Sequence, residues 1–177
     1  MHVTKTITIN RPIDEVYTFW RDFENLPRFM YHLEIVETTG SNRSHWVAKA
    51  PAGKSVEWDA EVTEDRPGEL IAWRSVGNDD DVRNSGSVRF MKAPGDRGTE
   101  VRVDLDYDPP GGKAGSIVAK LFGEEPTIQI GDDLHRLKQV METGEVLRSH
   151  GAPEGIGRSV LRQHASQPSE SEARPQL

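Results

Sequence analysis

The sequence predicts an α+β fold in which a curved antiparallel sheet of seven strands wraps around one long helix near the C-terminus. Three observations support this prediction. An isolated strand comes first, two short helical segments follow it, and strands then continue without interruption until a helical pattern begins. One long helix covers one face of such a sheet, and the space between the two layers is where an apolar cavity is expected.

The strands are predicted from the alternation of apolar and polar side chains. Val101, Val103 and Leu105, for example, alternate with Arg102 and Asp104, the period of a strand with one buried face. Proline and glycine between these runs favour tight turns, and therefore antiparallel hairpins. The predicted strands cover residues 2–10, 33–39, 44–50, 54–64, 69–76, 84–92 and 98–108.

Helices are predicted at both ends of the domain. Two short segments, from Pro12 to Trp20 and from Phe23 to Met30, follow the first strand. Near the C-terminus Gly123 and Pro126 interrupt the helical pattern, because glycine favours a helix end and proline the first turn of a new helix. The result is two helices or one broken helix, with apolar residues spaced as Ile117, Leu121, Ile130, Leu134, Leu137 and Met141.

Composition predicts one domain at residues 1–147, followed by a polar tail at 148–177 with too few apolar groups to fold.

The net charge of −7 and the absence of a basic run argue against a nucleic-acid partner. The chain has no cysteine, and its histidines lack metal-ligand spacing, so neither a metal nor a cofactor is expected. No apolar run approaches the ~18 residues of a membrane span, which predicts a cytoplasmic protein.

Several segments resemble one known family. They are Ile9–Pro12 leading to Val16 and Trp20, Phe23–Pro27, Ile71–Ser75, Gly86–Phe90 and Lys120–Pro126. From Thr4 to Glu145 the chain is similar to the polyketide cyclase/dehydrase and lipid transport superfamily, also called START-like or SRPBCC, close to its coenzyme-Q-binding and cyclase/dehydrase branch. The resemblance implies a helix-grip fold with a deep cavity between the sheet and the C-terminal helix, which relatives use for lipids, quinones, polyketide chains or hormones.

Large apolar side chains on the inward positions are the candidate cavity residues, and Phe29 with Met30 is interpreted as a lid. An empty apolar cavity of ~300 Å³ would cost roughly 7 kcal/mol, so aromatic side chains, water or a ligand must occupy one of that size. The candidates are Phe29, Met30, Trp46, Trp58, Trp73, Ser75, Phe90, Tyr107, Ile117 and Leu121.

Catalytic residues are not predicted. The charged side chains of the central strands fall opposite the apolar ones and are expected to face solvent as cross-strand pairs. They are Glu57, Asp59, Glu61, Asp104, Asp106, Arg74, Arg89 and Arg102. The inward positions of these strands offer the hydroxyls of Ser75 and Tyr107 and indole N–H groups, but no His, Asp or Glu.

Three functions therefore remain open. The first is binding or transport of a hydrophobic small molecule, such as a lipid, quinone or polyketide-like compound, which needs a dry pocket and one or two polar anchors. The second is an enzyme of cyclase, aromatase or dehydratase type that moves protons on a bound ketone chain. The third is a regulatory module whose outer face binds another protein. Transient contact with a membrane fits the first function, and the sequence leaves the oligomeric state open.

Overall fold

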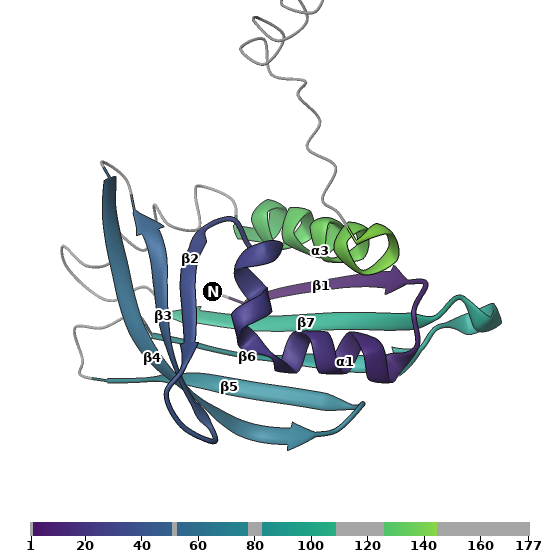
Figure 1. The fold of residues 1–177 in the computed structure, drawn as a ribbon, viewed down its shortest axis with the longest axis horizontal. Coiled ribbons are helices and arrows are strands. Elements are labelled where there is room, and N and C mark those ends of the chain that lie inside the picture. The colour runs from purple at the N-terminus through teal and green to yellow at the C-terminus, as the bar shows by residue number, and fades with distance from the viewer. Residues whose placement is uncertain (1, 51–52, 78–82, 109–125, 145–177) are drawn as a thin grey trace, which may run out of the picture. The chain divides into compact units, whose positions relative to one another are not determined.

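The computed structural model describes residues 2–50, 53–77, 83–108 and 126–144 (Figure 1). These residues form an antiparallel sheet of seven strands with helices packed against it, which confirms the predicted fold. The strand order is β1-β7-β6-β5-β4-β3-β2. Strand β1 therefore forms one edge of the sheet, beside β7, the last strand of a meander. The strands are β1 (His2–Ile9), β2 (Leu33–Thr38), β3 (Arg43–Ala50), β4 (Lys54–Arg66), β5 (Leu70–Val76), β6 (Arg83–Lys92) and β7 (Thr99–Asp108).

The sheet bends strongly along β4. In Figure 1, β2, β3 and β4 run across the direction of β1, β6 and β7. Pairing between β4 and β5 shifts register between Val62 and Glu64, where one extra residue enters β4. Such a bulge bends its strand and increases the local twist. The bend directs the inner faces of the two ends of the sheet toward each other.

The short helices after β1 lie close to their predicted positions. Helix α1 (Ile13–Arg21) buries Val16 and Trp20, which lie four residues apart on one face. Acidic residues in its first turn and Arg21 in its last complement the helix dipole. The second segment is a 3₁₀ helix, η1 (Phe23–Arg28), with Pro27 inside it. A second short 3₁₀ helix, η3 (Pro94–Asp96), lies between β6 and β7.

Helix α3 (Pro126–Thr143) packs along β1, and the turn after β1 holds its C-terminal end (Figure 1). The Arg11 guanidinium donates to the backbone oxygens of Met141 at 2.8 Å and Glu142 at 3.1 Å. The Glu142 carboxylate in turn accepts from the backbone N–H of Asn10 at 2.7 Å. The two bonds from Arg11 satisfy carbonyl groups that the end of a helix leaves without partners. The predicted helical pattern before Pro126 lies outside the described residues.

The core lies between the sheet and the three helices α1, η1 and α3. Trp20 of α1 occupies its middle, with ring centroids 5.5 Å from Phe29 and 6.5 Å from Phe90. Leu134 and Leu137 bring α3 into the same cluster, and both are almost fully buried. Burying an aromatic or aliphatic side chain of this size contributes roughly 1.5–3 kcal/mol each.

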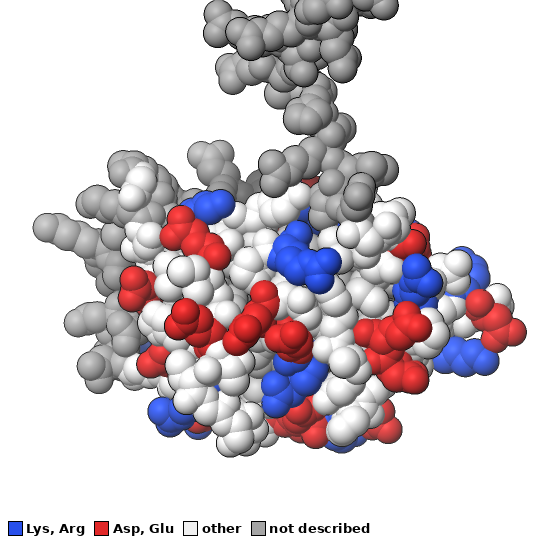
Figure 2. Space-filling model, in the orientation of Figure 1, with Lys and Arg blue, Asp and Glu red and all other residues white. Residues whose placement is uncertain are grey.

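Some of the charged side chains of the central strands form the predicted cross-strand pairs, whereas Arg102 contacts Asp104 on its own strand. Arg74 of β5 donates to Glu61 of β4 at 2.7 Å, and these two residues are register partners. His45 of β3 contacts Asp59 of β4 at 2.8 Å in the same way. Figure 2 shows acidic side chains spread across the face in view, with Lys and Arg among them. Within the described ranges, no helix has both the length and the apolar character that crossing a membrane requires.

Candidate functional site

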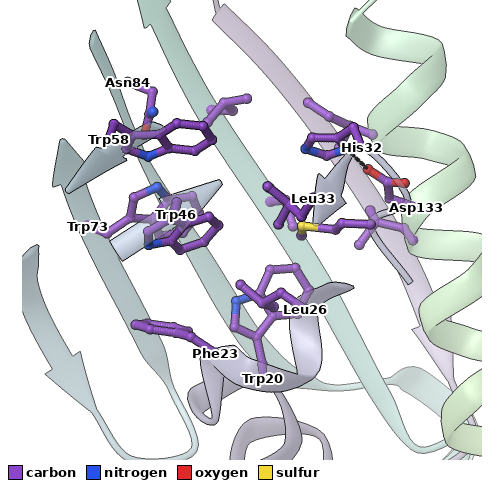
Figure 3. A pocket seen from close by; sticks show the side chains of 15 residues that line it. Trp20, Phe23, Leu26, His32, Leu33, Trp46, Trp58, Trp73, Asn84 and Asp133 are labelled. Carbon is purple, nitrogen blue, oxygen red and sulfur yellow. Dashed lines mark ion pairs between the residues drawn. The ribbon is translucent and has the colours of Figure 1, made fainter. Parts of the chain in front are cut away.

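A cavity of about 80 Å³ lies between the inner face of the sheet, η1 and α3. Its lining is mostly apolar, and it includes all four tryptophans of the chain. The strands contribute from one side and α3 from the other (Figure 3). The lining residues are Trp20, Phe23, Leu26, Met30, His32, Leu33, Trp46, Trp58, Trp73, Asn84, Val103, Leu105, Ile130, Asp133 and Leu134.

Four aromatic side chains, Phe23, Trp46, Trp58 and Trp73, form what we call the aromatic wall. Trp46 of β3 and Trp58 of β4 are register partners, and their rings stack at 5.8 Å with 25° between planes. Phe23 of η1 extends the wall, 6.0 Å from Trp46. The Trp46 indole N–H donates to the Ser44 hydroxyl at 2.8 Å, so that polar atom is satisfied away from the cavity. Flat aromatic faces therefore dominate this side.

The predicted cavity residues fall into three groups. Met30, Trp46, Trp58 and Trp73 lie in the cavity lining. Phe29, Ser75 and Phe90 lie elsewhere: Phe29 is fully buried against Trp20, and the Ser75 hydroxyl accepts from the backbone N–H of Asn84 at 3.0 Å. The side chain of Tyr107 and all of Ile117 and Leu121 lie outside the described part of the chain.

The lid interpretation therefore needs correction for Phe29. Its ring packs into the core with centroids 5.5 Å from Trp20 and 6.3 Å from Phe19, so it does not cover an opening. Met30 is half-buried and lines the cavity. An apolar void of the observed 80 Å³ costs about 2 kcal/mol at ~24 cal/mol per Å³, which one domain can sustain.

One polar pair faces this apolar space, and sequence reasoning missed it. His32, just before β2, and Asp133, on α3, both line the cavity (Figure 3). The His32 Nδ1 atom lies 3.6 Å from Asp133 Oδ2, and the two side chains are only 15% and 5% exposed. We call His32 and Asp133 the polar pair. The inward positions considered from the sequence were those of the central strands, whereas these two residues lie on a loop and a helix.

Arg136 fixes the orientation of Asp133. It lies one turn further along α3 and donates to Asp133 Oδ1 at 2.7 Å. Its guanidinium also stacks 4.3 Å from the centroid of the Tyr31 ring. One carboxylate oxygen is thus held by Arg136, while the other faces His32.

Burial shifts the pKa of both members of the polar pair in opposite directions. Burial, together with the positive charges of Arg136 and Lys49, lowers the pKa of His32 to about 4. Burial raises the pKa of Asp133 to about 7; the neighbouring Asp132 adds to this shift and Arg136 opposes it. At neutral pH the imidazole is therefore uncharged, and the contact is not a pair of full charges although its geometry resembles one. Asp133 exchanges its proton near neutral pH.

The comparisons with known proteins agree with this architecture. The chain is 41% identical to the crystal structure of DR_A0006 from Deinococcus radiodurans, which matches 81% of this chain and 99% of that one with a TM-score of 0.65. It is 26% identical to TTHA0849 from Thermus thermophilus, over 78% of this chain and 95% of that one, with a TM-score of 0.63. Among curated proteins, an uncharacterized 17.2 kDa protein of Streptomyces lincolnensis is 31% identical over 146 residues, which is 79% of this chain and 89% of the relative.

The family model described as polyketide cyclase / dehydrase and lipid transport matches residues 9–135. This stretch runs from the end of β1 to the middle of α3 and contains every residue of the cavity lining, the polar pair included. The resemblance identified from the sequence segments is confirmed. The chain belongs to the polyketide cyclase / dehydrase and lipid transport family.

Proposed function

We propose that this protein binds a hydrophobic small molecule, such as a lipid, a quinone or a polyketide-like compound, in the cavity. The observation that carries the proposal is the gathering of all four tryptophans of the chain around one largely apolar space. Indole rings bury large apolar areas and stack on conjugated rings. Membership of a family described by lipid transport and polyketide cyclisation supports the same class of ligand.

The size of the cavity limits what binds without rearrangement. Its volume of about 80 Å³ is smaller than the ~150 Å³ of an engineered apolar cavity that holds benzene. Even a ligand of one ring therefore requires the lining to move. Met30 is the side chain best suited to do so, because it is half-buried and its unbranched thioether adapts to irregular shapes.

Filling the cavity is expected to abolish ligand binding and leave the fold intact. Leu105 lines the cavity from β7, and Leu105→Phe adds a ring there. Native mass spectrometry followed by denaturing extraction would detect an apolar molecule bound to the wild-type protein and absent from this variant. Met91→Phe, a similar change at an exposed position of β6, is the matched control and keeps the molecule. Wild-type protein that carries no such molecule and does not bind added 4-ethyltoluene contradicts the proposal.

The polar pair favours a second candidate, an enzyme of cyclase, aromatase or dehydratase type. An uncharged imidazole beside a carboxyl group with a pKa of about 7 supplies a base and an acid inside an apolar space. Such an enzyme would remove a proton from the carbon next to a bound ketone and return one. The test is deuterium exchange at that carbon of 1-tetralone in D₂O, followed by NMR. Exchange no faster than in buffer, or unchanged in Asp133→Asn, excludes this candidate.

A further inference from the structure

We propose that His32 and Asp133 form a recognition site for one hydroxyl group of a ligand whose apolar body lies against the aromatic wall. The site belongs to the cavity already described, so this inference rests on the proposed binding function. It goes further because it specifies the ligand: a ring or conjugated body that carries a phenol-type or alcohol hydroxyl.

The spacing of the pair allows one oxygen atom, placed to the side of the two, to contact both. The 3.6 Å between His32 Nδ1 and Asp133 Oδ2 is longer than a hydrogen bond between these atoms. A hydroxyl oxygen fits at about 2.8 Å from each of them, the usual hydrogen-bond length. The Arg136 contact holds Asp133 Oδ1 at 2.7 Å, so Oδ2 is the oxygen that a ligand meets.

The hydrogen-bonding capacity of the pair selects a hydroxyl over other polar groups. A hydroxyl donates to a carboxylate and also accepts from a protonated carboxyl group or an imidazole N–H, so it matches the pair in every protonation state. A carbonyl only accepts, and it lacks a partner at Asp133 whenever that residue is ionised. A ligand carboxylate would place a second negative charge beside Asp133 and Asp132 in a buried site.

The position of the pair orients the ligand across the cavity. Figure 3 shows the tryptophans of β3, β4 and β5 on one side and His32 with Asp133 on the other, beside α3. The third polar lining residue, Asn84, lies near Trp58 on the sheet side, away from the pair. A ligand that stacks on Trp46 therefore directs a substituent on its opposite edge toward the pair.

The test compares two probes of nearly equal size, 4-ethylphenol and 4-ethyltoluene, which differ by a hydroxyl in place of a methyl group. Binding to the full chain at pH 7 is followed by NMR of the indole N–H resonances of the cavity tryptophans. The phenol is expected to bind about tenfold more tightly, since a hydrogen bond to a buried, partly charged group contributes on the order of 1.5 kcal/mol. Hydrophobicity alone would favour the toluene.

Asp133→Asn isolates the contribution of the carboxylate. The amide oxygen keeps the contact with Arg136, so the amide nitrogen replaces the oxygen that faces the hydroxyl, and the phenol loses its acceptor. The preference for the phenol is expected to fall to about twofold or less. Asp14→Asn, the same chemical change at an exposed position of α1 away from the cavity, is the control and keeps the full preference. His32→Gln provides an independent loss of preference if Asp133→Asn does not fold.

The outcomes separate the two proposals. Equal affinity of the wild-type protein for both probes overturns the hydroxyl site and leaves apolar binding in place. A preference that survives in both Asp133→Asn and His32→Gln also overturns it. If neither probe binds the wild-type protein up to its solubility limit, the binding function itself is overturned, and the hydroxyl site with it.

Discussion

Replacing Gly86 by alanine is expected to lower the free energy of unfolding by about 2 kcal/mol and to displace the Trp73 ring from the aromatic wall. Gly86 of β6 and Trp73 of β5 are register partners, and the indole lies against the glycine. A Cβ atom on Gly86 would lie 2.6 Å from a ring carbon of Trp73 and 2.8 Å from the backbone oxygen of Asp104. The ring and the neighbouring strand β7 must therefore both move.

The magnitude follows from two opposing effects. Overpacking a well-packed site costs about 1–3 kcal/mol, and contact with backbone belongs at the upper end of that range. Alanine also restricts the unfolded chain, which favours folding by roughly 0.4–1 kcal/mol. The net loss stays large because the contact with the Asp104 oxygen remains wherever the Trp73 ring moves.

Urea unfolding of Gly86→Ala, with Ser87→Ala on the same strand as the control, measures the effect. The Ser87 substitution is expected to change stability by less than about 0.5 kcal/mol. Repeating the glycine substitution in a Trp73→Ala background removes the clash with the ring and keeps the one with Asp104, so the cost should shrink but not vanish. A Gly86→Ala protein as stable as the wild type, with unchanged ligand affinity, would show that the sheet accepts a side chain there.

The fold was predictable because its determinants are local. Alternation and turn chemistry place β7 within one residue of its observed start at Thr99. The largest difference at a strand end is in β4, which continues to Arg66 instead of ending at residue 64. The bulge between Val62 and Glu64 shifts the alternation there while pairing with β5 continues to the turn. A bulge of this kind leaves no clear signal in the pattern of apolar residues.

The cavity was predictable only in part, because its lining comes from distant segments. Trp46, Trp58 and Trp73 follow from inward positions on strands, whereas Trp20, on the buried face of α1, was not among the predicted cavity residues. Asp133 did carry a signal, since it lies three residues after Ile130 on the apolar face of α3. Its partner on the loop before β2 follows only from the packing of α3 against the sheet, which no periodicity encodes.

The substitutions Asp133→Asn and His32→Gln are expected to change the pH dependence of stability in opposite directions. In the unfolded chain, between about pH 4 and 6.5, His32 is charged and Asp133 is ionised, so the pair binds one proton. In the folded protein, with pKa values of about 4 and about 7, His32 is neutral and Asp133 is protonated, which is again one proton. Because stability changes with pH only when the two states bind different numbers of protons, the pair contributes almost no slope.

In Asp133→Asn, His32 is the only member of the polar pair that still contributes to the pH dependence of stability. The folded pKa of about 4 lies below the unfolded value of 6.5, so the unfolded chain binds more protons in this window. The stability of the variant relative to wild type is therefore expected to fall as pH drops from 6.5 to 4, by about 3 kcal/mol in all.

In His32→Gln only the contribution of Asp133 remains. The pKa of Asp133 is about 7 in the folded protein and 3.8 in the unfolded chain. The stability of this variant relative to wild type is expected to fall by a similar amount, on the order of 3 kcal/mol, as pH rises from 4 to 7.

Urea unfolding of wild type, both single variants and the double variant at four pH values between 4 and 7.5 checks this linkage. Differences from wild type remove the contribution of every other titrating group, provided the substitutions leave those groups undisturbed. In the double variant neither contribution is present. Its stability should therefore change with pH in parallel with that of the wild type, although it lacks both ionisable groups. Single variants that also run parallel to wild type would mean that neither residue changes its pKa on folding. Parallel single variants would also remove the support that an acid–base role for the polar pair takes from its shifted pKa values, because that role needs a carboxyl group that exchanges its proton near neutral pH.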